Sequence, residues 1–102
     1  MIKKIWPAKD PQENPSLPYG FNWTPRNIGT QQIVSIDTTV ISGSVTVDAS
    51  TVAEIPNART GQGTAHVFSG GVDGEMCELL LTATTEDGSV MQQTVYLPIR
   101  QK

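Results

Sequence analysis

The last quarter of the chain constrains the fold most strongly, because its apolar residues alternate through two long stretches separated by one turn. The stretches are EMCELLLTATT (residues 75–85) and VMQQTVYLPIR (residues 90–100), and EDGS between them centres on Asp87-Gly88. The apolar positions that share one face are Cys77, Leu79, Leu81 and Ala83 in the first stretch, and Met91, Val95, Leu97 and Ile99 in the second. A period of two on both sides of an Asp-Gly turn predicts a long antiparallel β-hairpin.

Shorter segments upstream repeat this period. Alternation predicts strands at residues 19–23, 33–40, 45–47 and 64–68, with Val34, Ile36 and Val40 on the inner face of the second. Residues 49–63 carry Pro56, Asn57, Gly61 and Gly63, and we expect a long loop with at most a short strand near Val52 to Ile55. Seven or so short strands and no helix candidate predict one all-β domain, an immunoglobulin-like antiparallel β-sandwich.

Prolines set the beginning of the chain apart. Five of the seven lie in the first 25 residues, at Pro7, Pro11, Pro15, Pro18 and Pro25. Because each fixes φ and removes a backbone donor, residues 1–18 are predicted to form an extended Pro-rich N-terminal arm, and residues 19–102 the sandwich. Trp6 and the prolines suit an arm that docks on a neighbour with little loss of entropy.

Aromatic residues alternate directly after this arm, at Tyr19, Phe21 and Trp23. The favoured interpretation is a first strand that covers the core, since the chain has only six Phe, Tyr and Trp residues. The alternative is an exposed aromatic face that binds a ligand.

Charge is distributed unevenly along the chain. Residues 1–26 carry Lys3, Lys4, Lys9 and Arg26 against Asp10 and Glu13, which is +2, whereas residues 27–99 carry Arg59 against eight carboxylates, which is −7. Arg100 and Lys102 return +2 and bring the total to −3. This distribution argues against a nucleic-acid-binding face, and it suits either a terminus that docks on an acidic neighbour, such as a second copy, or charged tails that serve solubility.

Signals for catalysis and for cofactors are weak. His66 is the lone histidine and is expected on a sheet surface, while the lone Cys77 is expected to be a small buried hydrophobe. The acids of residues 73–78 lack the spacing of a calcium loop, so a solvated turn is the expectation there. We therefore expect no enzyme activity, no cofactor and no metal. With no apolar run near 20 residues and no signal peptide, we expect a soluble chain made in a cytoplasm, without membrane association.

An ordered set of short motifs resembles a group of small virion proteins of tailed phages and prophages. The motifs are KDPQEN, YGFNWTP, GTQQIVS, GSVTVD and VFSGGVDGEMCELLLTATTEDGSVMQQTVYLPIR, and together they span about residues 9–100. Lys9-Asp10-Pro11 matches the opening of the group, Tyr19 to Trp23 its aromatic step, and Ser69-Gly70-Gly71 its turn. Asn22 stands where an acid is usual. The group is described as fibre–tail adaptor or tail accessory proteins, and the resemblance implies an immunoglobulin-like structural protein of the virion without a cofactor.

The function predicted from these observations is a multi-copy adaptor in the neck or tail of a phage. It would link the portal or tail tube to fibres or to neighbouring subunits in a ring. The expected partner-binding residues are Trp6, Lys9, Asp10, Pro11, Arg100 and Lys102, and we expect a further contact at a free edge of residues 90–99, because Pro98 cannot donate to a ladder. The alternatives are a head decoration protein and a carbohydrate-binding module.

Overall fold

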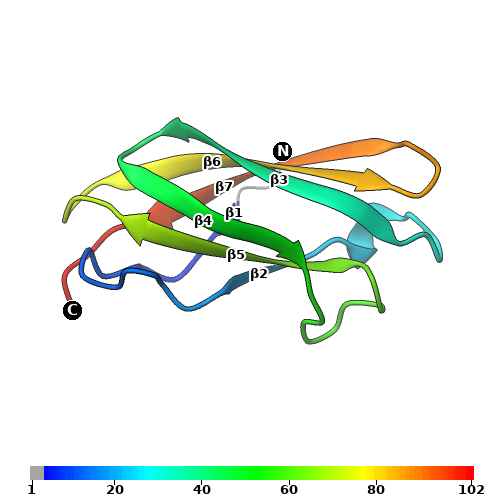
Figure 1. The fold of residues 1–102 in the computed structure, drawn as a ribbon, viewed down its shortest axis with the longest axis horizontal. Helices are drawn as coiled ribbons and strands as arrows, with labels where there is room; N and C mark the ends of the chain where they lie inside the picture. Colours follow the sequence, from blue (N-terminus) through cyan, green and yellow to red (C-terminus); the bar gives the residue numbers. More distant parts are fainter. Residues whose placement is uncertain (1–3) are drawn as a thin grey trace.

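The computed structural model describes residues 4–102, which form seven β-strands in two sheets and one short 3-10 helix (Figure 1). The elements are β1 (Lys4–Ile5), β2 (Tyr19–Asn22), η1 (Thr24–Arg26), β3 (Ile33–Ser42), β4 (Val45–Val52), β5 (Gly63–Gly70), β6 (Met76–Thr85) and β7 (Val90–Pro98). One sheet has the order β1-β7-β6-β3 and the other β2-β5-β4. The prediction of an all-β protein is confirmed.

The β6–β7 hairpin has the register that the sequence predicts. It pairs from Met76 with Pro98 to Thr84 with Val90, and Gly88 in its turn has φ of 86°. The side chains of the inner face are fully buried, namely Cys77, Leu79, Leu81, Ala83, Val95, Leu97 and Ile99. This hairpin supplies the centre of the four-stranded sheet and about half of the core.

The turn between β3 and β4 carries the chain from one sheet to the other. Gly43 in this turn has φ of 113°, and a Cβ atom built there would lie 2.4 Å from the Cys77 sulfur. Glycine is required at this position for both reasons. Val45 then enters the core as expected, at 6% exposure.

The predicted faces of β3 and the length of β4 need correction. Ile33 is buried and Val34 is 60% exposed, because a β-bulge between Ile33 and Ser35 changes which side chains face inward. Strand β4 continues to Val52, whereas the prediction ended it early and placed a loop from residue 49. Four pairs with β5, from Ala49 with Val67 to Val52 with Thr64, stabilise this extension despite its polar sequence.

Residues 4–18 are non-helical, as the prolines predict, but they lie against the domain and do not project from it as a free arm; residues 1–3 of the predicted arm lie outside the described residues. Strand β1 pairs in parallel with β7, and Trp6 is 3% exposed. The Trp6 ring stacks on Tyr19 at 5.2 Å between centroids, and its Nε1 donates to the Gly20 carbonyl at 3.1 Å. Trp6 is therefore part of the core.

The prediction that the last strand forms a sheet edge is wrong for the part of β7 from Val95 to Pro98. Lys4 and Ile5 pair with Val95 and Tyr96, and the Trp6 amide donates to the Tyr96 carbonyl. Strand β7 therefore lies between β1 and β6. The N-terminal segment covers the edge that the sequence seemed to leave open.

Tyr19 and Phe21 of β2, and Trp23 directly after it, cover the core, as favoured above. Trp23 is fully buried and its Nε1 donates to the Thr64 hydroxyl at 3.0 Å, while Tyr19 and Phe21 pack against the core from partly buried positions. This arrangement removes the exposed aromatic face on which a carbohydrate-binding module would depend.

His66 lies in the core, contrary to the expectation of a surface position. Its side chain is fully buried, with Nδ1 2.9 Å from the Thr38 hydroxyl and Nε2 2.9 Å from the Thr64 hydroxyl. Burial lowers its pKa from 6.5 to about 4. A neutral imidazole therefore links β3 of one sheet to β5 of the other.

Candidate partner-binding site

Residues 9–14 and residues 99–102 meet at one end of the sandwich, where Figure 1 shows the segment before β2 beside the C-terminus. We call these residues the terminal cluster. The Lys9 amide donates to the Pro98 carbonyl and the Arg100 amide donates to the Lys9 carbonyl, so the two segments continue the parallel pairing of β1 with β7. Most of the predicted partner-binding residues therefore do lie together.

Lys9 is an internal anchor of this cluster. Its side chain is fully buried, and Nζ donates to the Gly70 carbonyl at 2.7 Å and to the Asp10 carbonyl at 2.9 Å. Burial lowers the pKa of the amine, and the nearby carboxylates of Glu13 and Asp10 oppose this shift. Lys9 thus ties the N-terminal segment to the end of β5 and is not available to a partner in this conformation.

Asp10 and Pro11 form a tight turn. The Glu13 amide donates to the Asp10 carbonyl at 3.0 Å, which places Pro11 at the second position of a β-turn, where its fixed φ is favourable. The Asp10 carboxylate accepts from the Gln12 amide at 2.9 Å and from the Lys102 amide at 3.0 Å. These two hydrogen bonds lower the pKa of Asp10, and the carboxylate joins the turn to the C-terminus.

The C-terminal cations are the exposed members of the cluster. Lys102 pairs with Glu13 at 3.3 Å, which is the one salt bridge within residues 4–102, and Arg100 is exposed. Of the six predicted residues, the structure places Trp6 and Lys9 inside, Asp10 and Pro11 at intermediate exposure, and Arg100 and Lys102 on the surface.

Sequence reasoning missed the role of the acids that follow β5. The Asp73 carboxylate accepts from the Gln101 amide at 2.9 Å, and Glu75 accepts from the Ser44 hydroxyl at 2.6 Å and from the Val72 amide at 3.0 Å. The Ser44 hydrogen bond is the main cause of the lowered pKa of Glu75. These carboxylates fix loops, and no group of three or more metal-ligating side chains occurs within the described part of the chain.

Exposed apolar side chains lie around these loops. Ile41 directly precedes the β3–β4 turn that Glu75 holds, and it is 52% exposed. Val72 and Met76 flank Glu75 in the sequence and are 60% and 48% exposed. Single exposed apolar side chains are common on protein surfaces, whereas a contiguous apolar patch rimmed by polar groups marks a contact surface.

These features define a small two-sheet β-protein in which residues 9–14 and 99–102 are held together at one end. The family model described as podophage GP4 fiber-tail adaptor protein gp77 matches residues 9–98, from the Lys9 anchor to the end of β7. The chain therefore belongs to this family of phage fibre–tail adaptor proteins, and the resemblance noted in its motifs is confirmed. No curated protein matches the chain. Within residues 4–102, no helix is long and apolar enough to cross a bilayer.

Proposed function

We propose that this protein is a multi-copy adaptor in the neck or tail of a phage or prophage particle. It links the portal or tail tube to fibres, and its copies contact one another around a ring. The match of the adaptor family over residues 9–98 carries this proposal. A structural adaptor acts by binding, so the proposal includes no enzymatic reaction.

An immunoglobulin-like topology is part of the proposal. In that fold one sheet contains strands B, E and D, and the other contains G, F and C. When the seven strands are lettered A to G in chain order, β2-β5-β4 corresponds to B-E-D and β7-β6-β3 corresponds to G-F-C, which supports this topology. Strand β1 lies beside β7, the last strand. Loops then gather at the two ends of the sandwich, and the terminal cluster lies at one of them.

The terminal cluster and the apolar residues beside it are the proposed contact surface. Arg100 and Lys102 offer cations, and Ile41, Val72 and Met76 offer apolar area. Weak contacts of this kind become collectively strong when several copies bind around one ring. Trp6 and Lys9 support the surface from inside by holding the chain ends in place.

Complementation of a phage from which the gene is deleted tests the adaptor role. We expect particles without the protein to lack fibres, and purified wild-type protein to restore fibre attachment. Met76→Asp with Val72→Asp should reduce incorporation, whereas Val90→Asp, at the opposite hairpin end and 61% exposed, is the matched control. Normal fibres on particles that lack the protein would overturn the adaptor role, and a loss confined to the capsid would favour head decoration.

A further inference from the structure

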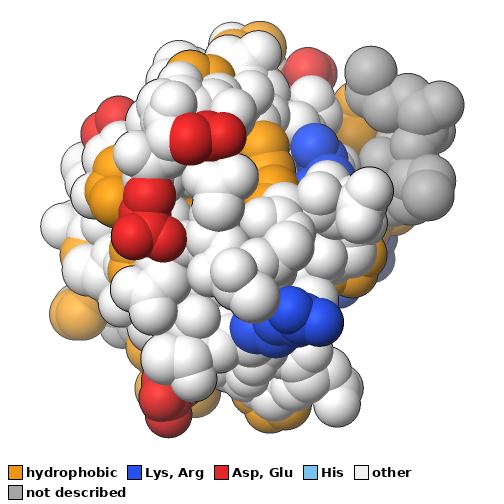
Figure 2. All heavy atoms as spheres, turned by 90° about the vertical axis from the view of Figure 1, so that its right-hand side faces the viewer, with side chains coloured by type: hydrophobic (Ala, Val, Ile, Leu, Met, Phe, Trp, Pro, Cys, Tyr) orange, Lys and Arg blue, Asp and Glu red, His pale blue; other side chains and the backbone are white. Residues whose placement is uncertain are grey.

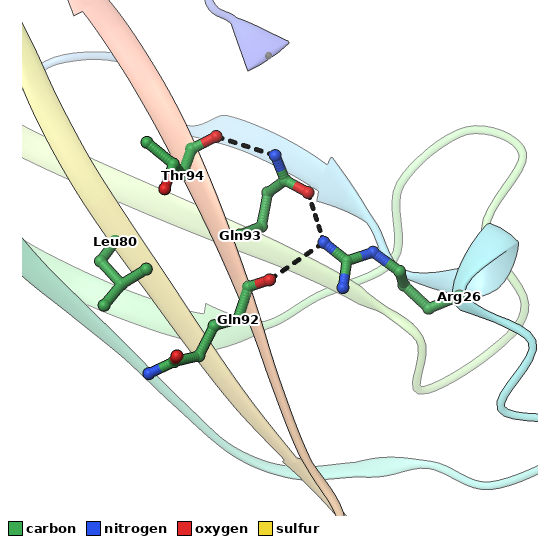
Figure 3. Close-up of a pocket in the computed structure, with 5 residues that line it drawn as sticks. All are labelled: Arg26, Leu80, Gln92, Gln93 and Thr94. Carbon is green, nitrogen blue, oxygen red and sulfur yellow. Dashed lines mark hydrogen bonds between the residues drawn. The ribbon is translucent and has the colours of Figure 1, made fainter. Parts of the chain in front are cut away.

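Arg26 is held rigidly beside a surface cavity of about 300 Å³. Figure 3 shows its side chain reaching from η1 to β7, where Nη2 donates to the Gln92 carbonyl at 3.0 Å and to the side-chain oxygen of Gln93. The Gln93 amide nitrogen in turn donates to the Thr94 carbonyl at 2.8 Å, which orients its oxygen toward Arg26. The guanidinium carbon also lies 5.5 Å from the centre of the Trp23 ring, within the range of a cation–π contact.

The charge of Arg26 is not neutralised within the described residues. Its hydrogen-bond acceptors are a carbonyl and an amide, and Arg26 takes part in no ion pair among residues 4–102. The chain has ten carboxylates, yet Figure 2 shows that most acidic side chains at this end lie on the left of the view and the Lys and Arg side chains on the right. A fixed cation therefore faces solvent on a protein of net charge −3.

The cavity provides the remaining parts of a small binding site. Leu80 contributes an apolar wall, and Gln92, Gln93 and Thr94 contribute polar groups. Both hydrogen bonds of Arg26 use Nη2, so Nε and Nη1 remain for a ligand. Each of these nitrogens can donate a single charge-assisted hydrogen bond to a carboxylate oxygen, whereas both two-nitrogen forks of the guanidinium include Nη2, which Gln92 and Gln93 occupy.

We propose that this cavity binds a carboxylate, supplied by an acidic side chain of a partner protein, with an apolar neighbour of that side chain against Leu80. The inference that a partner protein supplies the carboxylate rests on the adaptor role proposed above. The inference that the cavity binds a carboxylate does not depend on that role. Because the guanidinium is already oriented by Gln92, Gln93 and Trp23, binding loses little side-chain entropy.

The test is a nuclear magnetic resonance titration of the ¹⁵N-labelled full chain with acetyl-Leu-Glu-amide. We expect saturable shifts of the Arg26 Nε–H and of the side-chain amides of Gln92 and Gln93, weakening as salt is added. Acetyl-Leu-Gln-amide, which lacks only the charge, should bind at least tenfold more weakly. Sodium acetate distinguishes the source: binding as tight as that of the peptide would support the carboxylate site and assign it to small free carboxylates.

Arg26→Gln should weaken binding of the charged peptide at least tenfold, and Arg26→Lys should restore it only in part, because a lysine ammonium is a point charge on a flexible stem and cannot bond Gln92 and Gln93 with the geometry of the planar guanidinium. Arg59→Gln is the matched control, since Arg59 is also an exposed arginine near this end, with its guanidinium on the Gly29 carbonyl. Equal losses in the Arg26 and Arg59 variants would overturn the site, as would equal binding of the charged and neutral peptides. Unchanged spectra away from the cavity would show that the variants remain folded.

Discussion

Stability should fall when the pH decreases from about 6.5 toward 4, because His66 is buried in the neutral form. In that window the unfolded chain binds a proton at its histidine and the folded chain does not, so protonation favours unfolding. The folded pKa of about 4 against 6.5 corresponds to a full loss of about 3 kcal/mol. Between pH 7.5 and 5 the same two values give a loss of about 2 kcal/mol, and above pH 6.5 the group has no effect.

The effect of His66 between pH 7.5 and 5 can be separated from the titration of the carboxylates. Carboxylates with lowered pKa values, such as Asp10, Glu13 and Glu75, stabilise the fold in their charged form, and that stability is lost only below about pH 4.5. Urea unfolding, followed by tryptophan fluorescence at several pH values from 5 to 7.5, measures the slope of the free energy of unfolding against pH. His66→Gln should lower stability at neutral pH and remove the slope. A wild-type protein without this slope, or a variant that retains it, would refute the account of the buried histidine.

Other predictions concern the packing of the chain ends and of one turn. Trp6→Ala should destabilise the domain by about 3–5 kcal/mol in urea unfolding, because the ring is buried in the core; a loss below about 1 kcal/mol would restore the free-arm interpretation. Lys9→Met should cost about 1–3 kcal/mol through the lost hydrogen bond to Gly70, and no change would show that the amine is not an anchor. Gly43→Ala should lower the melting temperature more than Gly74→Ala, since both glycines have positive φ but only the first meets a neighbour; equal effects would show that contact with Cys77 is unimportant.

Local patterns predicted much of the body of the fold. The β6–β7 hairpin follows from alternation that is interrupted at Leu80 and Gln93 and from an Asp-Gly turn, and both signals come from adjacent residues. Trp23 follows from the same alternation, together with the scarcity of other large side chains. Bulges escape such reasoning: the one near Val34 shifts the inner face without any glycine or proline to mark it.

Interactions between distant residues explain the errors. Proline spacing predicted extended backbone for residues 4–18, but it carries no information on what that backbone lies against. The partners of Trp6 and Lys9 are Gly20, Gly70 and residues of β7, far apart in the sequence. His66 similarly has Thr38 as its partner across the sandwich, and the sequence does not indicate which hydroxyl will lie opposite the histidine in the folded protein.

In the candidate site, the structure brings most of the predicted residues together but gives some of them structural roles that the sequence did not predict. Lys9, Asp10 and Pro11 were expected to touch a partner, whereas the first anchors the segment and the others form a turn that holds the C-terminus. Arg26 was counted only as charge, because its cavity depends on the side chains of β7.

Cryo-electron microscopy of the intact particle tests the adaptor role most directly. The account predicts density for this chain in a ring at the neck or tail, in contact with fibres, with the terminal cluster or the neighbouring apolar residues against another virion protein. Density on the capsid lattice away from the tail, or absence of the chain from purified particles, would contradict it.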